Sequence, residues 1–120
     1  MKLEEAQALD AFAALSQQTR LQMVRVLVQA GPEGLPAGAV GEAVDASSSS
    51  VSFHLSNLER AGLVQSRRVS RSIIYSANYA GLSGLIEFLM RDCCQGHPEV
   101  CAPAVDAVTC CAPAKEKADA

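Results

Sequence analysis

Thiols are concentrated near the C-terminus of this chain, and their spacing is the first indication of chemistry. The stretch RDCCQGHPEVC, residues 91–101, contains the adjacent pair Cys93 and Cys94, followed by Cys101. Thiolates are soft ligands that select soft metal ions and metalloids, and neighbouring thiols can also be oxidised to a disulfide. The pattern therefore indicates a soft-metal or metalloid site, or a redox-sensitive thiol pair.

Several ligand sets are compatible with this cluster. Trivalent arsenic or antimony binds three sulfurs, which Cys93, Cys94 and Cys101 would supply, whereas a monomethylated arsenical needs only Cys93 and Cys94. Zinc could take the same three thiolates together with His97, and a redox sensor could join two of them in a disulfide. We favour the three-sulfur metalloid site, because directly adjacent cysteines are less usual for structural zinc than the C-x-x-C spacing.

Two further cysteines, Cys110 and Cys111, lie in a segment with little hydrophobic periodicity that repeats CAPA at residues 101–104 and 111–114. Biased sequence of this kind predicts a mobile tail. We therefore expect a folded domain over residues 1–95 and a cysteine-containing tail over residues 96–120. Cys110 and Cys111 are interpreted either as accessory thiols or as incidental ones.

The elements that must position these thiols follow from hydrophobic periodicity and capping residues. We expect a first helix from Leu3 to about Leu15 and a second helix that is capped by Ser16 and ended by Gly31 and Pro32. A third helix is expected over about Ala37–Val44, and a fourth within SSVSFHLSNLERAGLV (49–64). Two strands over about Leu63–Arg68 and Ser72–Ala77, with a turn at 69–71, are followed by a last helix from Tyr79 to Cys94. A short helix, a serine-led helix and a hairpin in this order predict a mainly α fold with a β-hairpin wing, the winged helix-turn-helix.

The fourth helix has an apolar face and a small polar face. At about 100° per residue, Val51, Leu55 and Leu58 cluster as the core face, and His54 lies beside it. The outward side is composed of Ser48, Ser49, Ser52, Phe53, Ser56 and Arg60. Hydroxyls can bond phosphate oxygens or base edges, and an aromatic ring can touch a thymine methyl group in the major groove. We therefore predict that this helix contacts DNA, and that His54 is partly buried and hydrogen-bonded.

Basic residues accompany this helix, although the chain as a whole has a formal net charge of −3. Residues 46–79 carry Arg60, Arg67, Arg68 and Arg71 against one acidic residue, Glu59. A local basic patch matters more for phosphate contact than the total charge does. Arg67, Arg68 and Arg71 on the hairpin are therefore predicted to contact the DNA backbone or a minor groove.

The first and last helices carry apolar stripes that no local partner obviously covers. The stripe of the first helix is composed of Leu3, Ala6, Leu9, Phe12 and Ala13, and that of the last helix of Leu82, Leu85, Ile86, Leu89 and Cys93. Winged helices that read duplex DNA usually act as two-fold dimers. These two helices are therefore the expected interface of a homodimer.

These stretches resemble the ArsR/SmtB family of bacterial metalloregulatory repressors. The resemblance rests on FAALSQQTRLQMVRVLV, SSSVSFHLSNLERAGLVQSRRVSRSIIYS and LIEFLMRDCC, which lie within residues 8–95. It implies a homodimer that binds its own operator DNA and leaves when a metal ion or metalloid binds. Arsenite-responsive members with cysteines just past the terminal helix are the most similar type, which implies Cys93, Cys94 and Cys101 as inducer ligands.

This chain also departs from the family pattern. The segment AGAVGEAVD lacks the cysteine motif that some arsenic and cadmium sensors carry, and GLSGLIEFLM lacks the Asp, His and Glu pattern of the terminal-helix zinc site. Ser70 stands where a wing glycine is typical. Only the cluster of Cys93, Cys94 and Cys101 is left as a candidate inducer site.

Together these observations predict a cytoplasmic repressor that binds double-stranded operator DNA as a homodimer and is released by arsenite or antimonite, with no required cofactor. The alternatives are a repressor of the same fold that responds to zinc, another soft metal or thiol oxidation, or a methylarsenite sensor that uses two cysteines. No apolar run is long enough to span a membrane.

Neither an enzyme nor a metalloid carrier fits the sequence well. No glycine-rich anion loop precedes any cysteine, and the helix end that the cysteines follow disfavours the thiolate form that a nucleophile needs. A thiol-rich carrier would have no use for the serine helix and the arginine-bearing hairpin. We therefore expect no enzymatic activity.

Overall fold

The computed structural model describes residues 3–90 of the chain. Met1–Ile86 form one compact unit and Glu87–Ala120 a second. The predicted boundary between residues 95 and 96, the five cysteines and the predicted tail all lie outside the described residues.

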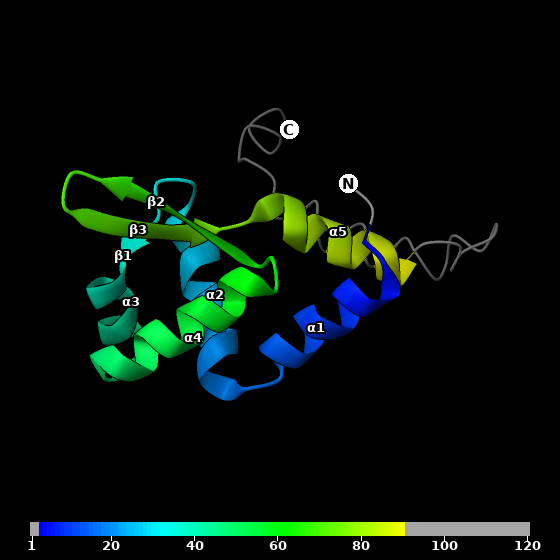
Figure 1. Ribbon diagram of the computed structural model, residues 1–120, viewed down its shortest axis with the longest axis horizontal. Helices are drawn as coiled ribbons and strands as arrows, with labels where there is room; N and C mark the ends of the chain where they lie inside the picture. The colour runs from blue at the N-terminus through cyan, green and yellow to red at the C-terminus, as the bar shows by residue number, and fades with distance from the viewer. Residues whose placement is uncertain (1–2, 91–120) are drawn as a thin grey trace, which may run out of the picture. The chain divides into compact units, whose positions relative to one another are not determined.

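The described part contains five helices and three short strands (Figure 1). In chain order the elements are α1 (Glu5–Leu15), α2 (Gln18–Ala30), β1 (Leu35–Pro36), α3 (Ala37–Val44), α4 (Ser48–Arg60), β2 (Val64–Val69), β3 (Ser72–Ala77) and α5 (Tyr79–Met90). The predicted order of four helices, a hairpin and a last helix is confirmed, and so are the bounds of α3 and β3. No helix within residues 3–90 combines the length and the apolar character needed to cross a membrane.

The core of the first unit is built from α2, α3, α4 and the hairpin. Its largest fully buried side chains are Met23, Leu27, Val40, Leu55, Leu58, Leu63 and Val64. The predicted core face of α4 is confirmed, because Val51, Leu55 and Leu58 are all at most 2% exposed. Burial of this face leaves the opposite side of α4 free for contact with a partner.

Helix α1 packs through small residues rather than through its large ones. Ala8, Ala11 and Ala14 form its buried face, which contacts α2 and α4. The apolar stripe expected from the sequence instead includes surface residues, with Leu9 61% and Phe12 36% exposed. The sequence pattern thus identified the helix, while its close approach to its neighbours depends on alanine.

Two helix starts show how capping sets the local structure. Ser16 was expected to cap α2, but this prediction is wrong: the N-cap is Gln17, whose Oε1 accepts from Arg20 N at 2.9 Å, and Ser16 is the C-cap of α1. Ser16 still belongs to the end of α1, because its N–H donates to the carbonyl oxygen of Ala13 at 3.2 Å. At α4 the N-cap is Ser47, whose Oγ accepts from Ser50 N at 3.3 Å.

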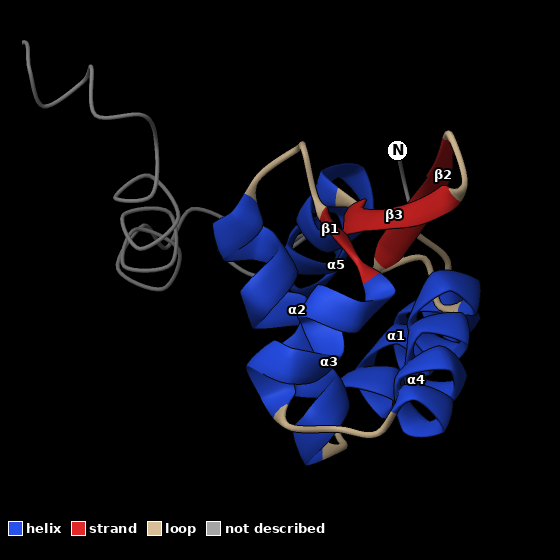
Figure 2. Cartoon of the chain, turned by 90° about the vertical axis from the view of Figure 1, so that its left-hand side faces the viewer, coloured by secondary structure: helices blue, strands red, loops and turns tan. Residues whose placement is uncertain are grey.

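The strands form an antiparallel sheet in the order β1-β3-β2, shown in red in Figure 2. The hairpin pairs Val64 with Ala77 and Val69 with Ser72, and Ser70 in its turn has a left-handed backbone with a φ of 59°. The two-residue strand β1 pairs with Ile74 and Tyr75 and was not expected from the sequence. It joins the wing to the segment that precedes α3.

Candidate nucleic-acid interface

The outward side of α4 is composed of the residues that the sequence predicted to contact DNA. Ser48, Ser49, Ser52, Phe53, Ser56 and Arg60 are all exposed. The short hydroxyl side chains leave the helix thin on this side, so that its backbone can approach a groove closely. Hydroxyls on such a face can donate to or accept from base edges and phosphates.

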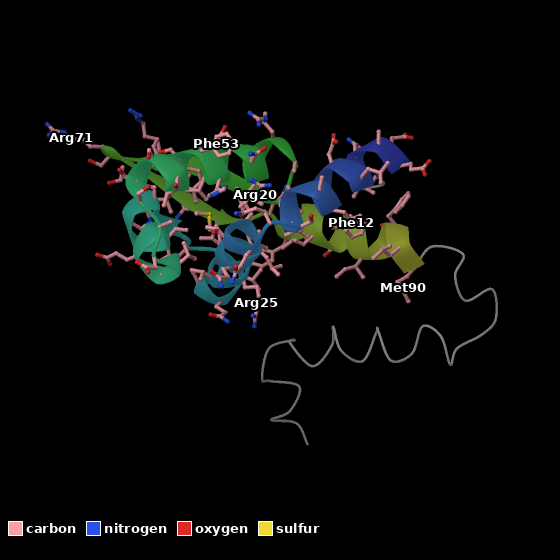
Figure 3. All side chains as sticks on the ribbon, turned by 90° about the horizontal axis from the view of Figure 1, so that it is seen from below. Phe12, Arg20, Arg25, Phe53, Arg71 and Met90 are labelled. Carbon is pink, nitrogen blue, oxygen red and sulfur yellow. The ribbon has the colours of Figure 1, made fainter. Side chains whose placement is uncertain are left out.

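Phe53 is the one large apolar side chain in the middle of this polar side (Figure 3). It is 61% exposed, and its ring meets the edge of the His54 ring with the centroids 5.5 Å apart. An aromatic ring held in water gains nothing from that exposure. A thymine methyl group in the major groove would bury it, which makes Phe53 the residue on α4 best suited to discriminate between base pairs.

The three hairpin arginines are all exposed, but they have different surroundings. Arg67 donates from Nη2 to the carbonyl oxygen of Glu33 at 2.8 Å and from Nη1 to that of Pro32 at 3.4 Å. For Arg68 and Arg71 no side-chain partner is found within the part of the chain that the structure describes, and Arg71 extends from the tip of the wing (Figure 3). The guanidinium donors of Arg68 and Arg71 are thus unused within residues 3–90, whereas Arg67 ties the wing to the segment before β1.

A further hydrogen bond ties the wing to α4. Ser66 Oγ, on β2, donates to Glu59 Oε2, on α4, at 2.8 Å. The hairpin and α4 are therefore held in register with each other, with Glu59 turned toward the wing. The exposed sides of the two elements are thereby held as one continuous surface.

His54 is partly buried and hydrogen-bonded, as the sequence predicted. Arg20 Nη1 lies 3.2 Å from His54 Nδ1. Because a guanidinium can only donate, Nδ1 accepts and the ring is neutral with its proton on Nε2. Burial of the ring, and then the positive charge of Arg20, lower the pKa of His54 from its ordinary value. Arg20 was not singled out in the sequence, because its partners lie on two other helices.

This contact gives the protein an acid-sensitive stability. The lowered pKa means that the unfolded chain binds a proton at His54 more readily than the folded one, so the free energy of unfolding falls as the pH drops through and below about 6.5. We expect urea denaturation to show a loss of stability between about pH 7.5 and pH 5.5. His54→Gln, which keeps an acceptor but cannot titrate, should lose less stability over that range. An equal loss in both chains would contradict the assignment.

A substitution at Phe53 tests directly whether the outward side of α4 contacts DNA bases. Phe53→Ala should weaken binding to a preferred duplex by about tenfold, which is about 1.4 kcal/mol, because the apolar contact to a base is lost. Binding to random-sequence DNA should change much less, since phosphate contacts dominate there. Thermal stability should stay nearly constant because the ring is exposed. Competition titrations with the two DNA types measure the difference, and Gln29→Ala at an exposed position of α2 serves as a surface control.

The predicted metal ligands cannot be placed in the same way. Cys93, Cys94 and Cys101, and the accessory Cys110 and Cys111, lie outside the described residues. Within residues 3–90 no group of three or more His, Cys, Asp or Glu side chains is arranged to hold a metal ion. The thiol site therefore stays a prediction from the sequence.

Comparison with known proteins agrees with this geometry. A model described as a helix-turn-helix domain matches residues 15–67, which include α2, α3, α4 and part of β2. The homodimeric winged helix-turn-helix DNA-binding domain of a Mycobacterium bovis protein has a similar structure, with a TM-score of 0.58 and 24% identity over 77% of this chain and 85% of that one. The fold is a winged helix-turn-helix.

Two further proteins that are similar to this chain are transcriptional regulators. An ArsR-like regulator from Rhodococcus sp. RHA1 has a TM-score of 0.66 and 28% identity, covering 89% of this chain and 93% of its own. The transcriptional activator HlyU from Vibrio cholerae is 29% identical over 81% of this chain and 87% of its own length. The winged helix-turn-helix of this chain is thus of the type found in ArsR-like and HlyU regulators. These relatives are not enzymes, which confirms the prediction that this chain is not one.

Proposed function

We propose that this protein is a homodimeric transcriptional regulator that binds operator DNA and is released when trivalent arsenic or antimony binds Cys93, Cys94 and Cys101. The observation that carries the DNA-binding part is the outward side of α4. It combines four exposed serines with the exposed Phe53, and it is bonded through Glu59 to a wing that presents Arg68 and Arg71. That combination supplies phosphate donors and base-reading groups on one surface.

The homodimer is supported by apolar surface on the first and last helices. Leu9 and Phe12 of α1 are 61% and 36% exposed, and Tyr79 and Ile86 of α5 are 41% and 43% exposed. Large apolar side chains gathered on a surface mark an interface with another protein. The similar Mycobacterium bovis domain is homodimeric, and a two-fold dimer would match a pseudo-palindromic operator.

The inducer part rests on the thiol chemistry of residues 93–101 in the sequence. Soft three-sulfur ligation favours arsenite and antimonite, and zinc, methylarsenite or oxidation of the thiols are the competing signals. One relative is named a transcriptional activator, so the direction of regulation is part of the proposal. Repression with release is the simplest mode for a protein whose inducer ligands would follow its dimer helix.

A fluorescence-anisotropy titration tests the proposal. The full-length chain is titrated onto a labelled duplex selected from a random pool, and arsenite, antimonite, methylarsenite, zinc, cadmium and peroxide are then added to separate samples of the complex. We expect salt-dependent binding and release by arsenite and antimonite. Release by zinc or peroxide alone would contradict the metalloid assignment and would indicate a zinc or redox signal instead. A chain that binds no duplex at any salt concentration would refute the regulator itself.

A further inference from the structure

A polar cleft opens beside α4, on the flank away from the wing. It has a volume of about 340 Å³ and lies between α1, α2 and α4. Its lining is Asp10, Ala13 and Ala14 of α1, Arg20 of α2, and Asn57, Arg60 and Ala61 at the end of α4. We propose that this cleft binds a phosphate group of the DNA backbone, an inference that rests on the proposed DNA-binding function and adds Arg20 and Asn57 to its interface.

The guanidinium of Arg20 is fixed in this cleft with donors to spare. Its Nε donates to the carbonyl oxygen of Ala14 at 2.7 Å, and its Nη1 donates to His54 Nδ1 at 3.2 Å. A guanidinium has five N–H groups, and no partner for the others is found within residues 3–90. A rigid fork with unused donors is well suited to phosphate. Its anchoring also lowers the side-chain entropy lost on binding.

Arg60 and Asn57 form the other wall. Arg60 Nη2 donates to Asn57 Oδ1 at 3.0 Å, which orients the guanidinium of Arg60 and leaves the amide NH₂ of Asn57 as a further donor. The three alanines of the lining keep the cleft open. Two cations and an amide donor thus face one volume, against the single carboxylate of Asp10, so the cleft has a net positive charge.

The position of the cleft favours a DNA phosphate over a small anion from solution. Counted at about 100° per residue along α4, Arg60 shares the outward side with Phe53, and Asn57 lies between that side and His54. Glu59 lies on the other flank, bonded to Ser66 of the wing. A helix in the major groove has a phosphate backbone on each side of it. The wing would meet one backbone and the cleft the other.

Asp10 gives the proposal a second, opposite test. Its carboxylate lies in the same cleft as the two guanidinium groups and repels a bound phosphate, so Asp10→Asn should strengthen DNA binding. Arg60→Gln should weaken it. Arg25 on α2 is the matched control, because it is exposed, carries the same charge as Arg60 and lies away from Phe53 and Arg20 (Figure 3).

The experiment measures the affinity of each full-length variant for a labelled duplex at several salt concentrations. For Arg60→Gln we expect the slope of log K against log salt to fall by about 0.9 for each DNA-bound subunit, with several-fold weaker binding on preferred and random sequences alike. Asp10→Asn should bind both DNAs several-fold more tightly. Arg25→Gln should keep the original slope, and circular dichroism confirms that each variant is folded.

Three results would overturn the proposal while leaving DNA binding itself intact. In the first, Arg60→Gln and Asp10→Asn leave the affinity and slope unchanged, although Arg68→Gln with Arg71→Gln lowers the slope. In the second, Arg25→Gln lowers the slope as much as Arg60→Gln does, so that only total charge matters. In the third, the variants alter binding of inorganic phosphate alone. Absence of any salt-dependent DNA binding in the unaltered chain would instead refute the proposed function.

Discussion

A chain with Cys93 and Cys94 both replaced by serine is expected to bind duplex DNA as tightly as the unaltered chain and to stay bound when arsenite is added. Serine is nearly the same size as cysteine, but its hydroxyl is a hard donor that does not compete for a soft metalloid. Allosteric coupling of this kind typically changes affinity by about 5- to 150-fold. The variant should lose that whole change, which anisotropy titrations with and without arsenite measure.

Cys101→Ser separates the two arsenical hypotheses. A three-sulfur site should lose its response to arsenite when Cys101 is replaced, whereas a two-thiol site for methylarsenite should respond as before. Cys110→Ser with Cys111→Ser is the control for thiol number, and a full response is expected if those thiols are incidental. Normal release by arsenite from the Cys93→Ser, Cys94→Ser chain would show that the inducer binds elsewhere.

Local signals in the sequence were sufficient for most of the fold. The bounds of α3 were predicted from the helical spacing of Val40, Ala43 and Val44, which stops at Val44. The strand β3 was predicted from a run of β-branched and aromatic residues at 73–75. The buried side of α4 was predicted from a single apolar stripe, because residues three or four apart lie on the same side of a helix with 3.6 residues per turn. In each case the determining residues are neighbours in the chain.

The failures arise where distant segments meet. The strand β1 has two residues, too few for a periodic signal, and exists because Leu35 and Pro36 can pair with Tyr75 and Ile74. The choice of Ala8, Ala11 and Ala14 as the buried side of α1 depends on how closely α2 and α4 approach it. Hydrophobicity alone favours the larger Leu9 and Phe12, so the close packing of small residues was invisible in the pattern.

The candidate site shows the same difference between residues that are close in the chain and residues that only the fold brings together. The serines and Phe53 could be predicted because one helix carries them all. Arg20 could not, because its bonds to Ala14 and His54 and its cleft with Arg60 join three helices. A single arginine at the start of a helix carries no signal of such a role. The surrounding sequence QQTRLQM shows only that Arg20 lies near a helix N-terminus.

Asn78 forms a joint between α5 and the chain segment that links α4 to β2. The side chain of Asn78 accepts from Gly81 N at 3.3 Å and donates to the carbonyl oxygen of Gly62 at 2.9 Å. Asn78 N donates to Leu63 O at 2.9 Å. The first turn of α5 is thus bonded to the chain segment that links α4 to β2. A displacement of the first turn of α5 would therefore act on both α4 and β2.

Gly81→Ala is expected to break this joint and to destabilise the fold strongly. A Cβ at Gly81 would collide with the backbone carbonyl oxygen of Gly62 and would crowd the amide of Asn78. Neither backbone can yield without loss of the Asn78 bonds, so the overpacking and the lost cap together should cost about 3 kcal/mol. For a domain of this size that corresponds to a melting temperature lower by about 10–20 °C, measurable by circular dichroism.

Gly38→Ala provides the matched control for this prediction. Gly38 is also helical, but nothing lies within 4 Å of a Cβ added there, so alanine should stabilise the protein by up to about 1 kcal/mol through its higher helix propensity. Opposite signs for the two glycines would show that the close approach at Gly62 causes the loss. Equal, small effects would mean that α5 begins without the close contact to Gly62.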